Sequence, residues 1–302
     1  MKERKTSRVA PFYKTIQNTN MSVDAFCYGD LPHVKYYLLS HFHSDHYQGQ
    51  YLDHYCRILS PNDNLGLTKH WTHPIVCSSI TKRLLVFKLK VKESLISTLD
   101  IGETKKFGES LVTALDANHC PGSVMFLIQL TSGHISLHTG DFRATPEMES
   151  LPEFWQSSFK VDTLYLDTTY CRPEYDFPSQ SDVIEKTVDL VRNFLSVRPN
   201  TVIMVGAYDV GKERIFKAIV EALDSKIWGD EKRADTWRCL EDEELLGRMV
   251  EDRARAQVQV ISNNLVSWAR LGQQFDLVRR PAGWSHVLGV KPTGWSHSRG
   301  ER

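Results

Sequence analysis

Short apolar runs, separated by polar or glycine-containing turns, dominate the first half of the chain. The run Val34–Leu39 predicts a buried strand, and Ile80–Leu89 is compatible with a short helix. Gly133 lies between two apolar runs and predicts the turn of a hairpin. Further strands are predicted at Pro74–Ser78, Leu111–Ala117, Ser123–Leu130 and His134–His138.

The pattern changes after Leu164–Asp167, where another predicted strand ends. Apolar residues recur at helical spacing along Ser179–Val197 and predict an amphipathic helix. A strand at Thr201–Gly206 and a helix at Lys212–Leu223 follow, which is typical of an α/β unit. We therefore predict an α/β protein with a domain boundary near Thr168–Pro178. Further along, the sequence is more charged and its pattern predicts no definite elements.

The composition limits the class of protein without naming a function. The chain has 302 residues, enough for a substantial core in one or two domains. Basic and acidic residues number 37 each, so any phosphate-binding surface must be local. Six scattered cysteines without a C-x-x-C pair argue against a disulfide scaffold or a zinc finger. No apolar run approaches a membrane span or forms the core of a signal peptide, so we expect no membrane partner.

A cluster of metal-ligand residue types directly follows the first predicted strand. It reads H-x-H-x-D-H and consists of His41, His43, Asp45 and His46. Imidazole and carboxylate together are typical ligands of Zn²⁺ and similar divalent ions. Because side chains alternate along an extended backbone, His41 and His43 are expected to share one face. The other two residues lie where the loop turns and are free to face a second ion. Isolated histidines are usually ordinary surface or core residues, but this spacing favours a metal site.

Two further candidate ligands follow later strands. His119 lies in D-A-N-H-C-P-G and Asp141 in T-G-D-F-R, each at the end of a predicted strand. Either residue alone is commonly a turn residue. With the H-x-H-x-D-H loop they complete two overlapping sets, in which His41, His43 and His119 hold one ion, Asp45 and His46 hold another, and Asp141 bridges them. Two ions about 3.5–4 Å apart can activate water and neutralise charge on a scissile phosphate.

Five motifs follow one another along the chain. They are V-D-A-F (Val23–Phe26), H-F-H-S-D-H (His41–His46), L-D-A-N-H-C-P-G-S-V-M-F (Leu115–Phe126), H-T-G-D-F-R (His138–Arg143) and Y-L-D-T-T-Y-C (Tyr165–Cys171). In sequence and in order they resemble the DNA cross-link repair nucleases of the metallo-β-lactamase superfamily, in its β-CASP branch. The resemblance runs from about Ala10 to Asp224 and resumes with G-W-S-H-S near the end.

This resemblance implies an αββα metallo-β-lactamase fold with an inserted β-CASP α/β domain. Residues 1–168 are then the N-terminal portion of the first domain, and residues 169–302 are part of the second. The implied activity is metal-dependent 5′-to-3′ exonucleolytic hydrolysis of DNA in interstrand cross-link repair in the nucleus. One or two zinc ions, DNA that is single-stranded or carries a 5′-phosphate, and DNA-repair proteins are the implied cofactor and partners.

The resemblance also assigns roles to carboxylates. Asp24 is expected to orient the ligand loop, and Asp167 opens the β-CASP segment and is expected to hydrogen-bond a ligand histidine. For both, an ordinary strand-end residue is the alternative. Asp45, Asp141 and Asp167 are the acidic residues expected to take part in catalysis.

A candidate phosphate site follows the strand at Thr201–Gly206. G-x-x-x-x-G-K there lacks the Ser or Thr of a nucleotide-binding loop, which argues against nucleotide hydrolysis. It resembles the family's G-x-Y-S-x-G-K-E motif, so Lys212 is a candidate phosphate contact. Asp209 stands where the family has Ser, and a carboxylate there should repel phosphate. A short repeat, Arg280–His286 and Lys291–His297, lies near the end. Its second copy and the next residue offer the remaining candidate contacts, Thr293, Ser296 and Ser298. Trp295 is a stacking or packing residue, and a buried tryptophan is the commoner explanation.

Two departures from the family pattern affect the prediction. The family's closing motif, S-[ED]-H-S-S-Y, carries a histidine for the second metal and is not found here, so we expect the C-terminal part of the fold to be missing. An extra segment at about 49–65 follows the ligand loop. Alternative interpretations are a truncated, weakly active or inactive paralogue that binds nucleic acid, an RNA-processing β-CASP nuclease, and a small-ester hydrolase.

Overall fold

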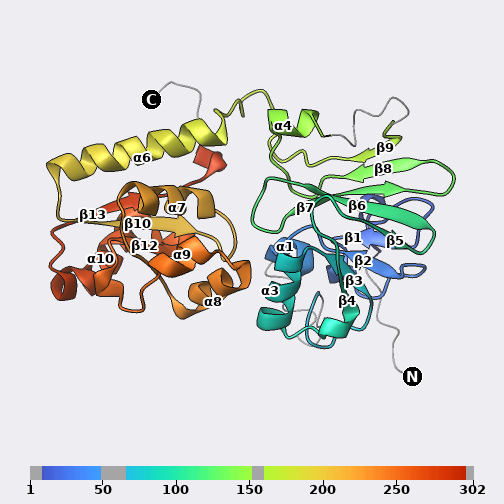
Figure 1. Ribbon diagram of the computed structural model, residues 1–302, viewed down its shortest axis with the longest axis horizontal. Coiled ribbons are helices and arrows are strands. Elements are labelled where there is room, and N and C mark those ends of the chain that lie inside the picture. The colour runs from blue at the N-terminus through green and yellow to red at the C-terminus, as the bar shows by residue number, and fades with distance from the viewer. Residues whose placement is uncertain (1–8, 49–65, 152–159, 297–302) are drawn as a thin grey trace. The chain divides into compact units, whose positions relative to one another are not determined.

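The computed structural model describes residues 9–48, 66–151 and 160–296. The chain divides into two compact units, Met1–Asp167 and Thr168–Arg302, and each is described by itself. Figure 1 shows the helices and strands of both units. In the described part of the chain, no helix has the length and apolar character needed to cross a membrane.

A parallel four-stranded sheet forms one layer of the first unit, in the order β1-β2-β3-β4. Helix α3 (Ser79–Leu89) connects β3 to β4, with the Ser78 hydroxyl accepting from the N–H of Thr81 at its start. Its end has Lys90 in the left-handed region, which is a common helix C-cap. The strands of this sheet are β1 (Met21–Val23), β2 (Tyr36–Leu38), β3 (Ile75–Cys77) and β4 (Ile96–Thr98). The other helices and turns here are η1 (Phe12–Lys14), η2 (Phe26–Tyr28), α1 (Ser44–Tyr47) and η3 (Glu93–Leu95).

A five-stranded sheet forms the second layer, in the order β5-β6-β7-β8-β9. Its strands are antiparallel except for the parallel pair β8 and β9. Gly133 turns β7 into β8 at a positive φ of 86°, as the hairpin prediction requires. The strands are β5 (Thr104–Phe107), β6 (Ser110–Asp116), β7 (Val124–Gln129), β8 (Ile135–His138) and β9 (Thr163–Tyr165), and α4 (Pro146–Glu149) precedes β9.

The two sheets share one core, which fixes the distance between them. Buried side chains from both sheets pack together, among them Val23 and Leu38 from the first and Val112 and Phe126 from the second. The other face of the five-stranded sheet packs against the segment around α4, which contributes Met148. Loops from both sheets are therefore held at fixed positions relative to each other.

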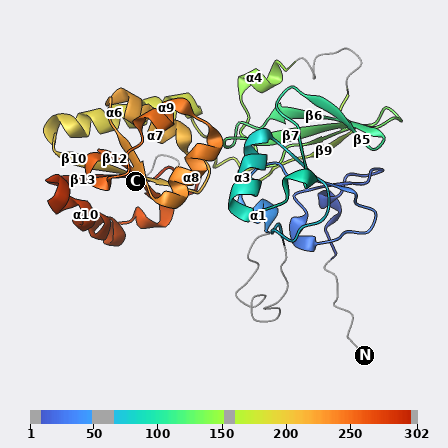
Figure 2. The same cartoon turned by 60° about the horizontal axis from the view of Figure 1, so that its bottom comes forward.

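The second unit contains a parallel four-stranded sheet in the order β11-β12-β10-β13. Helices α6 and α7 lie on one side of this sheet and α10 on the other (Figures 1 and 2). The strands are β10 (Thr201–Ala207), β11 (Ile227–Gly229), β12 (Val258–Ser262) and β13 (His286–Val290). The helices and turns are α6 (Gln180–Val197), α7 (Glu213–Ala222), α8 (Glu231–Leu240), α9 (Glu243–Arg248), η4 (Arg253–Arg255), η5 (Asn263–Leu265), α10 (Trp268–Ala282) and η6 (Gly294–Ser296).

The elements predicted in the first half and up to α7 are confirmed, with ends shifted by one or two residues in most cases. The short repeat is not a structural repeat, because Arg280–His286 ends α10 and begins β13, whereas the described part of the second copy, Lys291–Ser296, follows β13. The extra segment at 49–65 lies outside the described residues. The assignment of the two units to a metallo-β-lactamase and a β-CASP domain stays a prediction.

We expect Phe126→Ala to lower the free energy of unfolding by about 3–5 kcal/mol, because it opens a cavity in a close-packed core. The Phe126 side chain is completely buried between the sheets. Urea denaturation followed by intrinsic fluorescence measures the change. As a control, Leu164→Ala on β9, 52% exposed, should stay within about 0.5 kcal/mol of wild type. Equal losses from both variants would contradict the shared core.

Candidate metal centre

The ligand-type residues come from loops of both sheets in the first unit. His41 and His43 follow β2, and α1 then carries Asp45 and His46. His119 lies in the turn between β6 and β7, and Asp141 follows β8. The shared core holds these loops next to each other.

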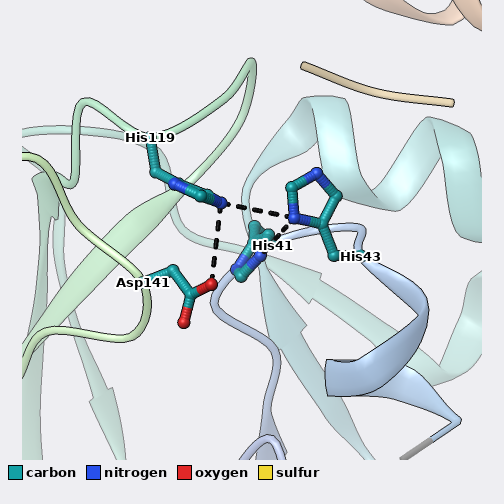
Figure 3. Close-up of side chains that lie close together, drawn as sticks. All are labelled: His41, His43, His119 and Asp141. Carbon is teal, nitrogen blue, oxygen red and sulfur yellow. Dashed lines mark hydrogen bonds and ion pairs between the residues drawn. The ribbon is translucent and has the colours of Figure 1, made fainter. Parts of the chain in front are cut away.

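Four side chains converge on one small volume (Figure 3). His41 Nε2 lies 2.9 Å from His43 Nδ1, and His43 Nδ1 lies 3.3 Å from His119 Nε2. An Asp141 oxygen, Oδ2, lies 3.7 Å from His119 Nε2. One ligand atom from each of the four residues can be chosen so that all lie within 4.8 Å of one another. The structure thus brings together residues that are up to 100 positions apart.

The distances in this group suit a tetrahedral divalent ion. Zinc–nitrogen bonds of about 2.0–2.1 Å place neighbouring ligand atoms about 3.3 Å apart, and the three contacts given above bracket that value. Burial, with the nearby histidines, lowers the pKa of His41 well below its usual range. Burial and the charge of His43 lower the pKa of His119 to about 3. Both rings are therefore neutral at pH 7, which is the form that binds metal.

A second set lies around His46. Its Nε2 is 3.4 Å from Asp141 Oδ1 and 3.7 Å from Asp45 Oδ2. Burial lowers the pKa of His46, but the charges of Asp24 and Asp141 and their hydrogen bonds outweigh it and raise the pKa to about 10. The ring is therefore protonated at pH 7 without an ion, and binding of a metal by His46 would have to release this proton. Asp141 directs Oδ1 toward His46 and Oδ2 toward His119, which is the geometry that a bridging carboxylate needs.

Asp24 is a buried carboxylate that connects the loop residues. Its Oδ1 accepts the N–H of Ser40 at 2.9 Å, and its Oδ2 accepts the hydroxyl of Ser40 at 2.7 Å. The same Oδ2 lies 2.8 Å from His46 Nδ1. Burial raises the pKa of Asp24, but the charge of His46 and its hydrogen bond outweigh this and hold the pKa well below its usual range. Asp24 is therefore charged, and it orients the ring of His46.

Hydrogen bonds and close packing hold the loops of His119 and Asp141. The hydroxyl of Ser123 accepts the N–H of His119 at 3.2 Å. The side-chain amide of Asn118 donates to the carbonyl of Arg143 at 3.2 Å, which joins the two loops. Gly140 has a φ of +53°, and a Cβ built there would lie 2.7 Å from the Cβ of Ser40. The turn that carries Asp141 therefore requires glycine next to the ligand loop.

The comparisons with known proteins agree with this geometry. A family model described as "Beta-lactamase superfamily domain" matches residues 17–204, more than half of the chain. The chain belongs to the β-lactamase superfamily. The α/β fold prediction is thereby confirmed, and the clustered histidines and carboxylate indicate that this superfamily member uses a divalent metal.

Curated relatives within the superfamily have names that match the predicted resemblance. The chain is 38% identical to the DNA cross-link repair 1A protein of Mus musculus, over 94% of this chain and 26% of that protein. It is 37% identical to the DNA cross-link repair protein SNM1 of Arabidopsis thaliana, over 92% of this chain and 56% of that protein. It is 32% identical to the 5′ exonuclease Apollo of Danio rerio, over 85% and 42%. The chain thus spans a quarter to about half of the length of these superfamily relatives.

The other predicted site residues lie outside the group of four ligand-type residues. The backbone N–H of Asp167 donates to the hydroxyl of Thr139 at 3.0 Å, beside the turn of Asp141. In the second unit, Lys212 precedes α7 and has a φ of +75°. The hydroxyl of Thr293 accepts the N–H of Trp295. Ser296 ends η6, and Ser298 lies outside the described residues. The roles predicted for all of them stay predictions.

The sequence favoured burial of Trp295 over stacking on a base. Its side chain is 64% exposed, so burial is wrong. The ring centroid lies 5.1 Å from that of Tyr170, at a tilt of 48°. Trp295 therefore packs against a neighbouring ring while most of its surface stays accessible.

Sequence reasoning missed two residues that support the superfamily site. Ser40 connects Asp24 to His41, and its only sequence signal is its position directly before the H-x-H-x-D-H motif. The ring of His138 stacks on Tyr165, and its Nδ1 accepts the N–H of Gly140. Burial lowers the pKa of His138 to about 4, so this ring is neutral and can accept that hydrogen bond.

We expect Gly140→Ala to weaken divalent-metal binding by about 10- to 100-fold, the usual effect of displacing a support of a ligand. The methyl group would meet Ser40 and move the turn that carries Asp141. Competition with a chromogenic chelator measures the affinity.

Gly133→Ala is the matched control. Gly133 also has a positive φ, 86°, so alanine costs about 1–2 kcal/mol at either site, but a Cβ at Gly133 would meet no described atom within 4 Å. Its metal affinity should equal that of wild type. Equal affinities for the two variants would show that the close approach of Gly140 is not needed.

Proposed function

We propose that this chain performs metal-dependent 5′-to-3′ exonucleolytic hydrolysis of DNA in the nucleus, during repair of interstrand cross-links. The observation that carries the proposal is the convergence of His41, His43, His119 and Asp141. It occurs in a chain that is 38% identical to a DNA cross-link repair 1A protein and 32% identical to a 5′ exonuclease. Its protein partners would be other DNA-repair proteins.

Zinc is the ion that the donor set fits best. His41, His43 and His119 would hold one ion, and Asp45 with His46 would hold a second, with Asp141 shared between them. Bound ions of this kind lower the pKa of an attacking water and neutralise charge on the scissile phosphate. One oxygen of Asp141 faces His46 and the other faces His119, which supports a role for Asp141 as a ligand shared by both ions.

The chain's own residues supply orientation and charge. Asp24 fixes the ring of His46 and leaves Nε2 directed toward Asp45 and Asp141. Asp167 supports the Asp141 turn through its backbone contact with Thr139. Burial of His41 and His119 keeps these imidazoles neutral, so their nitrogen lone pairs are available to a cation.

Residues of the second unit would bind the substrate phosphate. The candidates are Lys212, Thr293, Ser296 and Ser298. Lys212 precedes α7, and helix amino ends favour anions. The N–H of Gly211 already donates to the carboxylate of Glu213, so it contributes nothing to a phosphate. The exposed carboxylate of Asp209 in the same loop opposes phosphate binding. We expect a single-stranded or 5′-phosphorylated DNA end as substrate.

Wild-type protein should digest 5′-phosphorylated single-stranded DNA, stop when chelator is added, and recover with Zn²⁺ or another divalent ion. Asp141→Asn should lower the rate about a thousandfold or more, because metal charge stabilisation supplies several kcal/mol. Gel analysis of end-labelled substrate measures both effects.

Asp276→Asn is the control for loss of a carboxylate, since the Asp276 side chain on α10 is 71% exposed, and its rate should be unchanged. Circular dichroism verifies that each variant is folded. No digestion by folded, metal-loaded wild type would contradict the proposal, and faster digestion of RNA than of DNA would favour the RNA-processing alternative.

We expect Asp209→Ser to strengthen binding of a 5′-phosphorylated single strand by up to about fivefold, since an exposed charge interaction contributes about 0.2–1 kcal/mol. Fluorescence anisotropy with a nuclease-resistant phosphorothioate strand measures the affinity. The same strand with a 5′-hydroxyl should show little change, and the gain should shrink at higher salt. Equal gains for both strands would show that Asp209 does not face the terminal phosphate.

A further inference from the structure

Ser40 lies between the buried carboxylate and the first candidate ligand. It is 1% exposed and lies two residues after the end of β2. Its hydroxyl oxygen is 2.7 Å from Asp24 Oδ2 and 2.9 Å from His41 Nδ1. A hydroxyl has a single proton, so at these distances it donates to one of its two neighbours and accepts from the other.

The direction of both hydrogen bonds follows from the carboxylate. The backbone N–H of Ser40 and the ring of His46 also face Asp24, so this carboxylate is a hydrogen-bond acceptor, and the hydroxyl proton of Ser40 points to its Oδ2. Toward His41 the same oxygen can then only accept. His41 Nδ1 must therefore carry the proton of the ring. A neutral imidazole has one such proton, which leaves Nε2 as a bare lone pair.

That lone pair is directed into the candidate metal centre. His41 Nε2 lies 2.9 Å from His43 Nδ1, within the group of four convergent ligand atoms. With the opposite tautomer, an N–H would point at the position of the cation, and the ring could not serve as a ligand. The tautomer of His41 thus decides whether the first ion can bind.

The backbone of Ser40 holds its hydroxyl in place. Its N–H donates to Asp24 Oδ1, and its carbonyl accepts the N–H of Val124 on β7. Gly140 packs directly against its Cβ. Both neighbouring segments therefore restrict the side chain to the position between Asp24 and His41.

We infer that Ser40 is a positioning residue that transmits the orientation imposed by Asp24 to His41 and holds His41 in the Nδ1–H tautomer, ready to bind a divalent cation through Nε2. One carboxylate then orients two candidate ligands, His46 directly and His41 through a hydroxyl. This inference rests on the metal site of the proposed function and adds a residue to it.

Long-range ¹H–¹⁵N correlation spectra of the metal-free protein test the tautomer directly. The His41 signals are those lost in His41→Gln. Wild type should show His41 with its proton on Nδ1, and Ser40→Ala should shift the population toward Nε2–H. Zn²⁺ affinity, measured by chelator competition, should fall about 10- to 100-fold in Ser40→Ala.

Ser136→Ala is the matched control, because Ser136 is also fully buried and, among the described residues, its hydroxyl has no hydrogen-bond partner. It should keep the wild-type tautomer and affinity. The Nε2–H form of His41 in wild type would overturn the inference, and this measurement does not depend on the folding of any variant. An unchanged tautomer and affinity in Ser40→Ala would also overturn it. Absence of nuclease activity would contradict the proposed function alone. The tautomer is measured on metal-free protein and the Zn²⁺ affinity without DNA, so neither depends on nuclease activity.

Discussion

The site depends on a charge that the fold buries. Asp24 is 2% exposed, and a carboxylate in such a place is costly unless donors surround it. Three donors meet it, two from Ser40 and one from His46. Removing any of them would leave an uncompensated charge in the interior, so the positions of Ser40 and the ligand loop are determined by the need to pair Asp24. The backbone of Asp24 has a φ of +50°, which shows that the chain accepts an unfavourable conformation to place this carboxylate.

The two-sheet architecture converts this local constraint into a metal centre. His41 and His43 follow a strand of the four-stranded sheet, whereas His119 and Asp141 come from loops of the five-stranded sheet. The common core fixes the separation of the sheets. Ser40 also links them, because its carbonyl accepts a hydrogen bond from the N–H of Val124 on β7. Short ligand-to-ligand distances across the two sheets therefore follow from packing that is formed elsewhere in the unit. A cation would bind to ligands that are already in position, and little ordering would be needed on binding.

The sequence predicted the parts of the structure that local pattern determines. The H-x-H-x-D-H spacing, the strand ends that carry His119 and Asp141, and the hairpin at Gly133 were all recognisable from the sequence alone. Elements without an apolar signal were missed: β5 reads T-K-K-F with only Phe107 buried, and α8 is rich in charged residues although Trp237 on it is fully buried. The role of Ser40 was also missed, because a hydroxyl shared between residues 24 and 41 is a tertiary arrangement. Trp295 was misjudged since the burial of a tryptophan depends on neighbours distant in sequence.

The candidate residues divide between the two units according to their chemistry. Every residue that supports the metal centre, from Asp24 to Asp167, lies in the first unit, whereas the candidate phosphate contacts lie in the second. Metal affinity is therefore a property of the two-sheet unit, fixed by buried hydrogen bonds that salt screens little. In the proposed function, phosphate affinity would depend on the charges of Asp209 and Lys212, and salt would screen an exposed charge such as that of Asp209 strongly. Because the chain has zero net charge, the proposed action on DNA would depend on such local contacts. Substitutions in the second unit would then change substrate preference while the chemistry of the first unit is preserved.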